Sequence, residues 1–394
     1  MMYKSLFILG RQPALGRAEL ESLLGSEHVK PISAGVVASD VDPADLAFSR
    51  LGGSIRMAKV LTSADTTNWP ELAHYLTQTL AKRLAPLPEG KLKLGLSVFG
   101  LQVDSRQLFR TGLDLKKVCK KAGRSVRLVP NTDLELSSAQ VLHNQLTGEL
   151  GMELLLVQNG HHTLLAQTVA VQDINAYAGR DQNRPKRDAR VGMLPPKLAQ
   201  IIVNLATGPL KPTPERVVLD PFCGTGVVLQ EAALMGYGTY GTDLEQRMID
   251  FTAINLEWLD QWHPIEAPIL EAGDATDHQW QSPFTVVAAE TYLGRPLSAW
   301  PNPEVLQEIM GTCNVVIEKF LRNIANQTQP GLRLCLAVPA WKAPNGRIYH
   351  LPLLDHLEKM GYNRVSFECA EAPDLVYYRP EQIVARELLV ITRK

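Results

Sequence analysis

Residues 217–226 read Val217-Val218-Leu219-Asp220-Pro221-Phe222-Cys223-Gly224-Thr225-Gly226, and this stretch decides the fold of the 394-residue chain. It predicts a short buried strand that ends on an acid, breaks at a proline and turns through two glycines into a helix. Such a junction lies at the carboxyl end of a parallel strand, where open α/β sheets bind ligands. Gly224 and Gly226 allow the main chain to approach a ligand closely, because they carry no Cβ atom.

Acidic residues also end the next two strands that the sequence predicts. Residues 238–243 form a second short strand, and Asp243 at its end suits a bidentate hydrogen bond to a ribose diol. A third acid-ended stretch, residues 270–275, contains Asp274. From the residues alone, both acids are also compatible with solvated side chains at the ends of ordinary strands.

The three strand ends together resemble the S-adenosylmethionine (SAM) methyltransferases of the seven-stranded α/β type, whose first motif is written much like Asp-Pro-Phe-Cys-Gly-Thr-Gly. The resemblance implies a Rossmann-like α/β domain over residues 193–394 and SAM as the cofactor. It implies that Asp220 lies near the methionine moiety, that Asp243 holds the ribose and that Asp274 holds the adenine amino group. The other cofactor-binding residues that the motif implies are Pro221, Cys223, Gly224, Thr225 and Gly226.

Length and composition indicate two or three globular domains without a membrane segment. The chain is too long for one compact domain, and its longest apolar runs are far shorter than a bilayer-spanning segment. The cysteines show no paired spacing, so the sequence indicates neither a zinc site nor a disulfide framework. We therefore expect a reduced, cytoplasmic protein without a bound metal. The cysteines are Cys119, Cys223, Cys313, Cys335 and Cys369.

The net charge of −1 conceals a contrast between the two halves of the chain. Residues 1–190 carry 24 Lys and Arg against 18 Asp and Glu, whereas residues 191–394 carry 16 against 23. A basic half joined to an acidic half suggests that the front of the chain meets a polyanion.

The front half alternates between strand and helix patterns. Residues 1–62 fit a ferredoxin-like α+β unit, with helices expected at 18–24 and 43–51 and Asp42 as an N-cap. In residues 63–170 a basic helix, a strand, a helix and a hairpin around Asn159-Gly160 follow one another. This layout resembles the THUMP domain, an RNA-binding module of tRNA-modifying enzymes.

Cations crowd together in two parts of the front half. In the helix expected over residues 114–124, lysines stand four residues apart, and this crowding of like charge favours a phosphate-facing role. A solvated helix face is an equal alternative. Residues 171–192 are polar, basic and without periodicity, which is typical of a linker. The RNA-binding residues expected from both segments are Lys116, Lys117, Lys120, Lys121, Arg124, Arg184, Lys186 and Arg187.

Several further motifs resemble the THUMP-containing tRNA (guanine-N2) methyltransferases that act at position 10, found in archaea and eukaryotes. The resemblance covers most of the chain and implies methyl transfer to a guanine amine of tRNA. A small activating subunit, which the eukaryotic relatives use, is a further partner that it implies. The motifs are Leu51-Gly52-Gly53-Ser54-Ile55, Arg184-Pro185, Leu194-Pro195-Pro196-Lys197-Leu198-Ala199, Asn204-Leu205-Ala206 and Asp220 to Gly226.

The sequence departs from this family after the fourth expected strand. Amine-methylating members carry an Asp/Asn-Pro-Pro-Tyr/Phe motif there, whose oxygen accepts hydrogens from the amine and whose ring stacks on the base. Here the strand at 284–289 ends in Glu290-Thr291-Tyr292-Leu293-Gly294, without either proline. Glu290 and Tyr292 are therefore the expected catalytic residues of an active enzyme. The alternatives are a non-catalytic tRNA-binding protein and a DNA adenine-N6 methyltransferase, which shares the amine chemistry.

The remaining sequence predicts the elements that complete the sheet. Helices are expected at 303–324 and 353–360, and strands at 332–338, 365–369 and 388–392. Tyr377, Tyr378 and Arg379 fall on a loop between the last two strands, where they suit either base stacking or packing.

Overall fold

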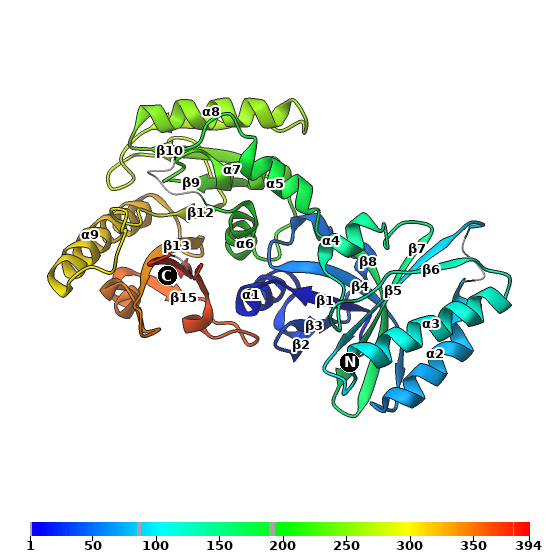
Figure 1. Ribbon diagram of the computed structural model, residues 1–394. Helices are drawn as coiled ribbons and strands as arrows, with labels where there is room; N and C mark the ends of the chain where they lie inside the picture. Colours follow the sequence, from blue (N-terminus) through cyan, green and yellow to red (C-terminus); the bar gives the residue numbers. More distant parts are fainter. Residues whose placement is uncertain (1, 85–87, 189–193, 381) are drawn as a thin grey trace. The chain divides into compact units, whose positions relative to one another are not determined.

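The computed structural model describes residues 2–84, 88–188, 194–380 and 382–394, and its contacts divide the chain into two compact units (Figure 1). The first unit holds residues 1–13, 27–49 and 54–175. The second holds residues 14–26, 50–53 and 176–394. Two early segments of the chain therefore belong to the second unit.

A single eight-stranded sheet forms the first unit, in the order β2-β3-β1-β4-β8-β7-β5-β6. β4 pairs with β8, so strands from residues 1–62 and 63–170 share one sheet. The boundary expected at residue 62 falls inside β4 and does not separate two units. The strands are β1 (Ser5–Leu9), β2 (Val29–Ser33), β3 (Val36–Ser39), β4 (Ser54–Ala64), β5 (Leu92–Phe99), β6 (Val126–Leu128), β7 (Gly151–Asn159) and β8 (His162–Val171).

Two amphipathic helices, α2 (Trp69–Leu84) and α3 (Ser105–Lys121), lie side by side and bury their apolar faces on this sheet (Figure 1). α3 begins earlier than the expected 114, because Asp104 and Gln107 form a capping box at its start. The shorter α4 (Ser138–His143) belongs to a separate apolar cluster of the same unit.

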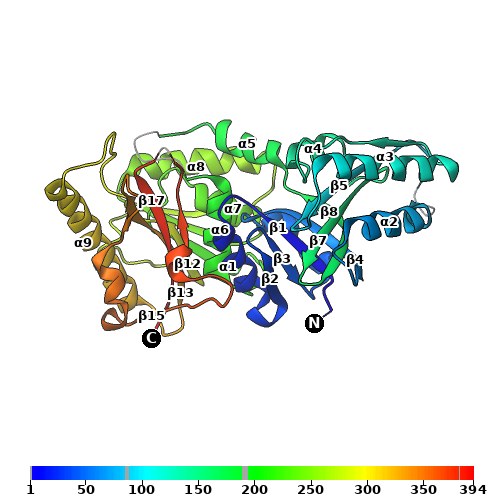
Figure 2. The same ribbon diagram turned by 60° about the horizontal axis from the view of Figure 1, so that its bottom comes forward.

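The second unit is built on a sheet in the order β11-β10-β9-β12-β13-β17-β15. β9 to β13 are mutually parallel, and β17 runs antiparallel to both β13 and β15; β12, β13 and β17 lie side by side in Figure 2. The expected seven-stranded, Rossmann-like α/β fold is confirmed. The strands are β9 (Val217–Asp220), β10 (Gly238–Asp243), β11 (Ile269–Ala272), β12 (Val286–Glu290), β13 (Arg333–Lys342), β15 (Tyr362–Arg364) and β17 (Val384–Arg393), with β14 (Ile348–Tyr349) beside β13 and β16 (Val376–Tyr377) beside β17.

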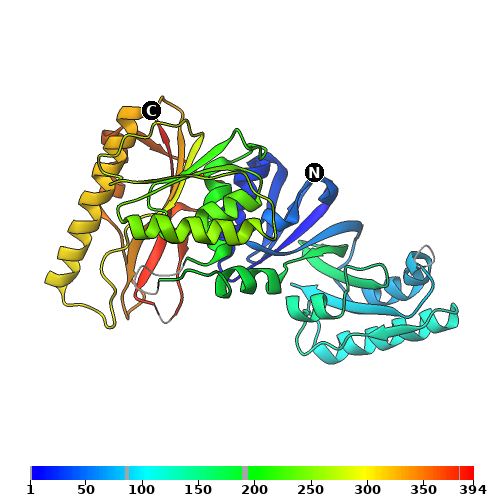
Figure 3. The same ribbon diagram turned by 90° about the horizontal axis from the view of Figure 1, so that it is seen from above.

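Helices cover both faces of this sheet. One face carries α1 (Pro13–Leu24), α6 (Pro196–Thr207), α7 (Val227–Leu234) and α8 (Gln246–Asp260). The other face carries the long helix α9 (Pro303–Gln327), and Figure 3 shows α8 and α9 on opposite sides. Every residue of α6 except Lys197 is buried, as expected of a helix that is packed on all sides.

Four expected elements differ in the structure. The helices expected at 43–51 and 353–360 are short 3-10 turns, since Leu46 has extended angles and His356 interrupts the second segment. The Asp42 N-cap itself is confirmed, because its carboxylate accepts the Ala44 N–H. The strand expected at 365–369 is not formed; the N–H groups of Glu368 and Cys369 donate to the Glu21 carboxylate instead. The linker expected over residues 171–192 contains helix α5 (Ile174–Gln182). The expected end of this linker, residue 192, lies outside the described residues.

A buried carboxylate joins the three separate segments of the second unit. Glu19 of α1 accepts hydrogen bonds from the N–H groups of Gly52 and Gly53, at 2.9 and 2.8 Å, and from Asn204 of α6 at 2.8 Å. A Cβ at Gly52 would lie 2.0 Å from the Lys197 carbonyl oxygen, so only glycine fits there. The Gly52-Gly53 pair is therefore required for this close approach.

We expect the stability of the second unit to depend on the ionisation of Glu19. Burial raises the pKa of Glu19 from its ordinary 4.5 to about 7, against the lowering effect of Asn204, Gly53 and Gly52. Between these values the folded state holds a proton that the unfolded chain has released, so this contribution is complete below pH 4.5 and is lost as the pH rises through 7.

Urea unfolding of wild type and Glu19→Gln, followed by tryptophan fluorescence, measures this contribution, because all tryptophans except Trp69 lie in the second unit. Wild type should lose up to about 3 kcal/mol of unfolding free energy relative to the variant between pH 4.5 and 7.5. A difference that stays constant across this range would contradict the expectation.

Candidate functional site

The strand order of the second unit reverses at β9, which has β10 on one side and β12 on the other. A parallel sheet opens a crevice at such a point, outside the carboxyl ends of its strands. The glycine loop follows β9, Asp243 ends β10 and Glu290 ends β12. The fold therefore brings the glycine loop, Asp243 and Glu290 to one crevice.

The glycine loop has a left-handed backbone that its two glycines permit. φ is +53° at Gly224 and +81° at Gly226, and a Cβ at Gly226 would lie 2.8 Å from the Thr252 side chain. The Thr252 hydroxyl donates to the Gly224 carbonyl at 2.9 Å, and Asn255 donates to the Thr225 carbonyl at 2.9 Å. Helix α8 thus fixes the loop from behind.

Asp243 links the glycine loop to β10. Its carboxylate accepts the Gly224 N–H at 2.9 Å and the Glu245 N–H at 3.0 Å. Burial raises the pKa of Asp243, and these two hydrogen bonds act in the opposite direction. The neighbouring Leu244 exposes 71% of its surface, so an apolar side chain stands uncovered beside the carboxylate.

Asp220 is fully buried at the end of β9. Burial raises its pKa well above the ordinary value, and the negative charges of Asp243 and Glu290 add to this shift, while the Phe222 N–H lowers it. The same surroundings raise the pKa of the Cys223 thiol well above its usual range. Cys223 is therefore a packed, protonated thiol and not an activated nucleophile.

Asp274 lies two residues beyond β11, the neighbour of β10. Its carboxylate accepts the Thr276 N–H at 2.9 Å, which orders the turn that carries it. The adjacent Gly273 N–H donates to the Asp243 carbonyl at 2.9 Å. Asp274 thus lies at the same edge of the sheet as Asp243. Pro221, another predicted cofactor-binding residue, is buried in the turn after β9.

Glu290 forms a buried ion pair that the sequence did not indicate. Its Oε1 accepts a hydrogen bond of 2.5 Å from Nε of Arg386 on β17, with 14% and 6% of the two side chains exposed. Burial raises the pKa of Glu290, and Arg386 lowers it. Arg386 and Glu387 are buried charged residues in a mostly apolar strand, which marks them as unusual but does not identify Glu290 as the partner of Arg386.

Tyr292 lies beside this pair in sequence and exposes 43% of its surface. Between them Thr291 is buried, and its N–H and hydroxyl both donate to the Ala337 carbonyl at 3.1 and 3.3 Å. The backbone at the end of β12 is therefore held in place, while the Tyr292 ring remains available for contact.

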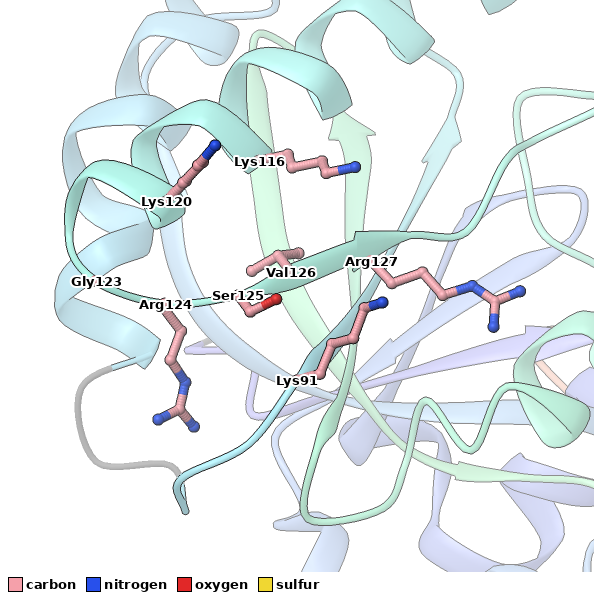
Figure 4. Close-up of a pocket in the computed structure, with 8 residues that line it drawn as sticks. All are labelled: Lys91, Lys116, Lys120, Gly123, Arg124, Ser125, Val126 and Arg127. Carbon is pink, nitrogen blue, oxygen red and sulfur yellow. The ribbon is translucent and has the colours of Figure 1, made fainter.

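Five cations surround a hollow of about 500 Å³ in the first unit (Figure 4). It lies between the carboxyl end of α3, the strand β6 and the residues before β5. Three of the predicted RNA-binding residues line it, namely Lys116, Lys120 and Arg124. Lys91 and Arg127 were missed, since only strand pairing brings these two cations next to the helix.

The other predicted RNA-binding residues are placed differently. Lys117 pairs with Asp114 at 2.9 Å, and neither it nor Lys121 lines the hollow. Arg184 is 3% exposed, which does not suit the contact with RNA that the sequence predicts for it. Burial lowers its pKa although Asp181 and Glu231 lie near.

Lys186 and Arg187 belong to the second unit. The main-chain N–H and carbonyl of Lys186 both form hydrogen bonds with the Asn255 side chain. The ammonium nitrogen of Lys186 lies 5.4 Å from the centre of the Phe251 ring. Arg187 is exposed.

No group of three or more His, Cys, Asp or Glu among the described residues is arranged to hold a metal ion. No helix in the described part of the chain is long and apolar enough to cross a membrane.

Comparison with known proteins assigns the central region of the chain to a class. Residues 184–289 match the family model described as an RMKL-like methyltransferase domain. The chain is 36% identical over 107 residues to the tRNA (guanine(10)-N2)-dimethyltransferase of Pyrococcus abyssi and 30% identical over 149 residues to that of Methanocaldococcus jannaschii. These alignments cover 26% and 38% of this chain. The methyltransferase domain that the motifs predicted is confirmed over residues 184–289.

The matched segments span only 30% and 38% of the length of these two relatives. Among solved structures, TrmN from Thermus thermophilus aligns over 100% of both chains, with a TM-score of 0.53 and 17% sequence identity. This likeness supports the fold over the whole chain.

We expect Glu290 and Arg386 to stabilise the fold as a pair. Removing one partner leaves the other charge buried and unpaired, so Arg386→Gln and Glu290→Gln should each lower the free energy of unfolding by about 3 kcal/mol. The double variant should lose clearly less than the sum of the two single losses. Urea unfolding of the four proteins measures the coupling, and additive losses would show that the ion pair contributes nothing.

Proposed function

We propose that the chain is a SAM-dependent methyltransferase that methylates an exocyclic base amine of tRNA, with N2 of guanine as the accepting group. The observation that carries this proposal is the convergence of the glycine loop, Asp243 and Glu290 where the strand order reverses. The match to a methyltransferase domain and the names of the relatives support it.

The residues at the crevice fit the cofactor. The left-handed glycine loop leaves room for a close approach, Asp243 offers carboxylate oxygens to a ribose diol, and the exposed Leu244 offers an apolar surface to a purine. SAM supplies a methyl group on a positively charged sulfur, which a crevice lined by acids favours. The residues proposed to hold it are Asp220, Pro221, Cys223, Gly224, Thr225, Gly226, Asp243 and Asp274.

At the end of β12, Glu290 accepts hydrogens of the base amine and Tyr292 stacks on the ring. Together they orient the nitrogen lone pair, so that the chain promotes the reaction mainly by positioning. The carboxylate also favours loss of the amine proton as the new bond forms.

The first unit serves as the RNA platform in this proposal. Its hollow gathers Lys91, Lys116, Lys120, Arg124 and Arg127, whose charges suit backbone phosphates. Its THUMP-like part is proposed for residues 63–170, and the strands of the ferredoxin-like part expected over residues 1–62 share the same sheet, while residues 14–26 and 50–53 belong to the second unit. A small activating subunit and a cytoplasmic location belong to the proposal as well.

The ion pair between Glu290 and Arg386 also favours a second candidate function. A carboxylate engaged by arginine is a weaker acceptor for an amine, which suits a protein that binds tRNA without modifying it. Binding of tRNA and of SAM without turnover would distinguish this candidate from an enzyme.

Methyl transfer from labelled SAM into unmodified tRNA, with the product nucleoside identified by mass spectrometry, tests the proposal. Wild type should form methylguanosine, and Asp243→Ala and Glu290→Ala should each lower kcat/KM by about 100-fold or more. Asp250→Ala, an exposed acid of α8, is the matched control and should retain activity.

Isothermal titration with SAM separates the two roles. Asp243→Ala should lose SAM affinity, whereas Glu290→Ala should keep it. Absence of label in tRNA, despite binding of both ligands, would contradict the proposal for the chain alone; a repeat in cell extract tests whether a partner restores activity.

The basic hollow predicts a specific pattern of tRNA affinity. Lys116→Ala/Lys120→Ala should weaken binding at least about tenfold and flatten its dependence on salt concentration by about one unit of slope per lost phosphate contact. Lys117→Ala/Lys121→Ala removes the same charge from the same helix outside the hollow and should have a much smaller effect. Filter binding at several salt concentrations measures both, and equal losses would disprove a role of the hollow.

A further inference from the structure

Glu290 and Arg386 lie on the same face of the second unit's sheet. Glu290 stands opposite Ala337, Ala337 stands opposite Leu388, and Arg386 is two residues from Leu388 along β17. Since directly paired residues and residues two apart share a face, both charged side chains emerge together at the crevice. The strand β17 thereby contributes to a site that otherwise comes from β9, β10 and β12.

The pair is joined by one hydrogen bond and retains further hydrogen-bonding groups. Nε of Arg386 donates to Oε1 of Glu290, whereas Nη1, Nη2 and Oε2 have no hydrogen-bond partner among the described residues. Both side chains are largely removed from water. None of these three atoms is among the described buried polar atoms that lack a partner, so each of them remains accessible to a ligand that offers complementary groups.

The free groups match the edge of one base. Guanine presents O6 as an acceptor beside the N1–H and the N2 amine as donors. A carboxylate only accepts hydrogen bonds and a guanidinium only donates them, so Glu290 suits N1–H and N2–H while Arg386 suits O6. Adenine has an amine in place of O6 and an acceptor at N1, so both contacts would become repulsive.

We infer that Arg386 is a specificity-determining residue that, with Glu290, selects guanine at the site by donating a hydrogen bond to O6. This inference rests on the proposed methylation of a guanine amine and extends it to the recognition of the base. The inference explains how the ion pair is compatible with an active enzyme. Arg386 holds the Glu290 carboxylate through Nε, and guanine forms hydrogen bonds with the remaining donors and acceptors of the pair.

A purely structural Arg386 would neutralise Glu290 and have no effect on base choice. Arg386→Lys separates the two roles, because lysine keeps the positive charge near Glu290 but lacks the planar fork of donors. Arg364→Lys is the matched control: Arg364 lies on the neighbouring strand β15 and contacts a different acid, Glu387, at 3.6 Å.

The test compares kcat/KM for tRNA transcripts that carry guanosine or 6-thioguanosine at the methylated position. Sulfur is a poor acceptor, while N1–H and the N2 amine are retained. Wild type and Arg364→Lys should prefer guanosine by about tenfold, and Arg386→Lys should reduce this preference to nearly one. An unchanged preference in Arg386→Lys would overturn the inference while methylguanosine formation still upheld the proposed function.

Failure of the proposed function has a separate signature, which is absence of methylguanosine in wild type. Photo-crosslinking of bound transcripts with scattered 6-thioguanosine needs no turnover and then decides the inference. Near-ultraviolet light attaches the thio-base to adjacent residues, and mass spectrometry locates them. Label within residues 384–393 would support recognition of guanine by β17, and label confined to other segments would overturn it.

Discussion

The reversal of strand order at β9 is the constraint on which the rest of the second unit depends. Because β10 and β12 leave β9 in opposite directions, their carboxyl ends cannot be covered by a single crossover helix. The crevice that results collects the glycine loop, Asp243 and Glu290. Helix α8 holds the loop through Thr252 and Asn255, and the loop in turn holds Asp243 through the Gly224 N–H. Loop, strand end and helix therefore form one connected hydrogen-bonded unit.

This convergence gathers negative charge in a place with little water. Burial raises the pKa of Asp220, and the negative charges of Asp243 and Glu290 add to this shift. Backbone N–H groups offset part of the cost of ionisation for Asp243, and Arg386 offsets it for Glu290. A cationic ligand in the crevice would offset more of it, so these electrostatics favour a sulfonium compound there.

Local patterns in the sequence predicted the elements of this site, but not its contacts. The sequence predicts these three strands because each short run ends on an acid: the runs before Asp220 and Glu290 are mostly apolar, and the run before Asp243 consists of glycine, threonine and tyrosine. Arg386 was missed, since it reaches Glu290 only through the pairing of β13 with β17, which no local pattern encodes. Lys91 and Arg127 were missed for the same reason, and Arg184 was misplaced because composition alone does not reveal burial. The Gly52-Gly53 motif was noticed, yet its contact with Glu19 required the fold.

The ion pair with Arg386 restrains Glu290 at the start of a segment that lacks the two prolines of the related motif. In an Asp/Asn-Pro-Pro-Tyr/Phe segment two proline rings fix the φ angles of the backbone between the acceptor and the aromatic ring. Here Thr291 replaces the first ring with two hydrogen bonds to the Ala337 carbonyl, which fix the main chain. The longer side chain of Glu290 still has more rotamers than an aspartate, and the hydrogen bond from Arg386 removes that freedom. Here a residue of β17, which lies beyond β13 in the sheet, restrains the acceptor, and the same residue is the proposed donor to the base.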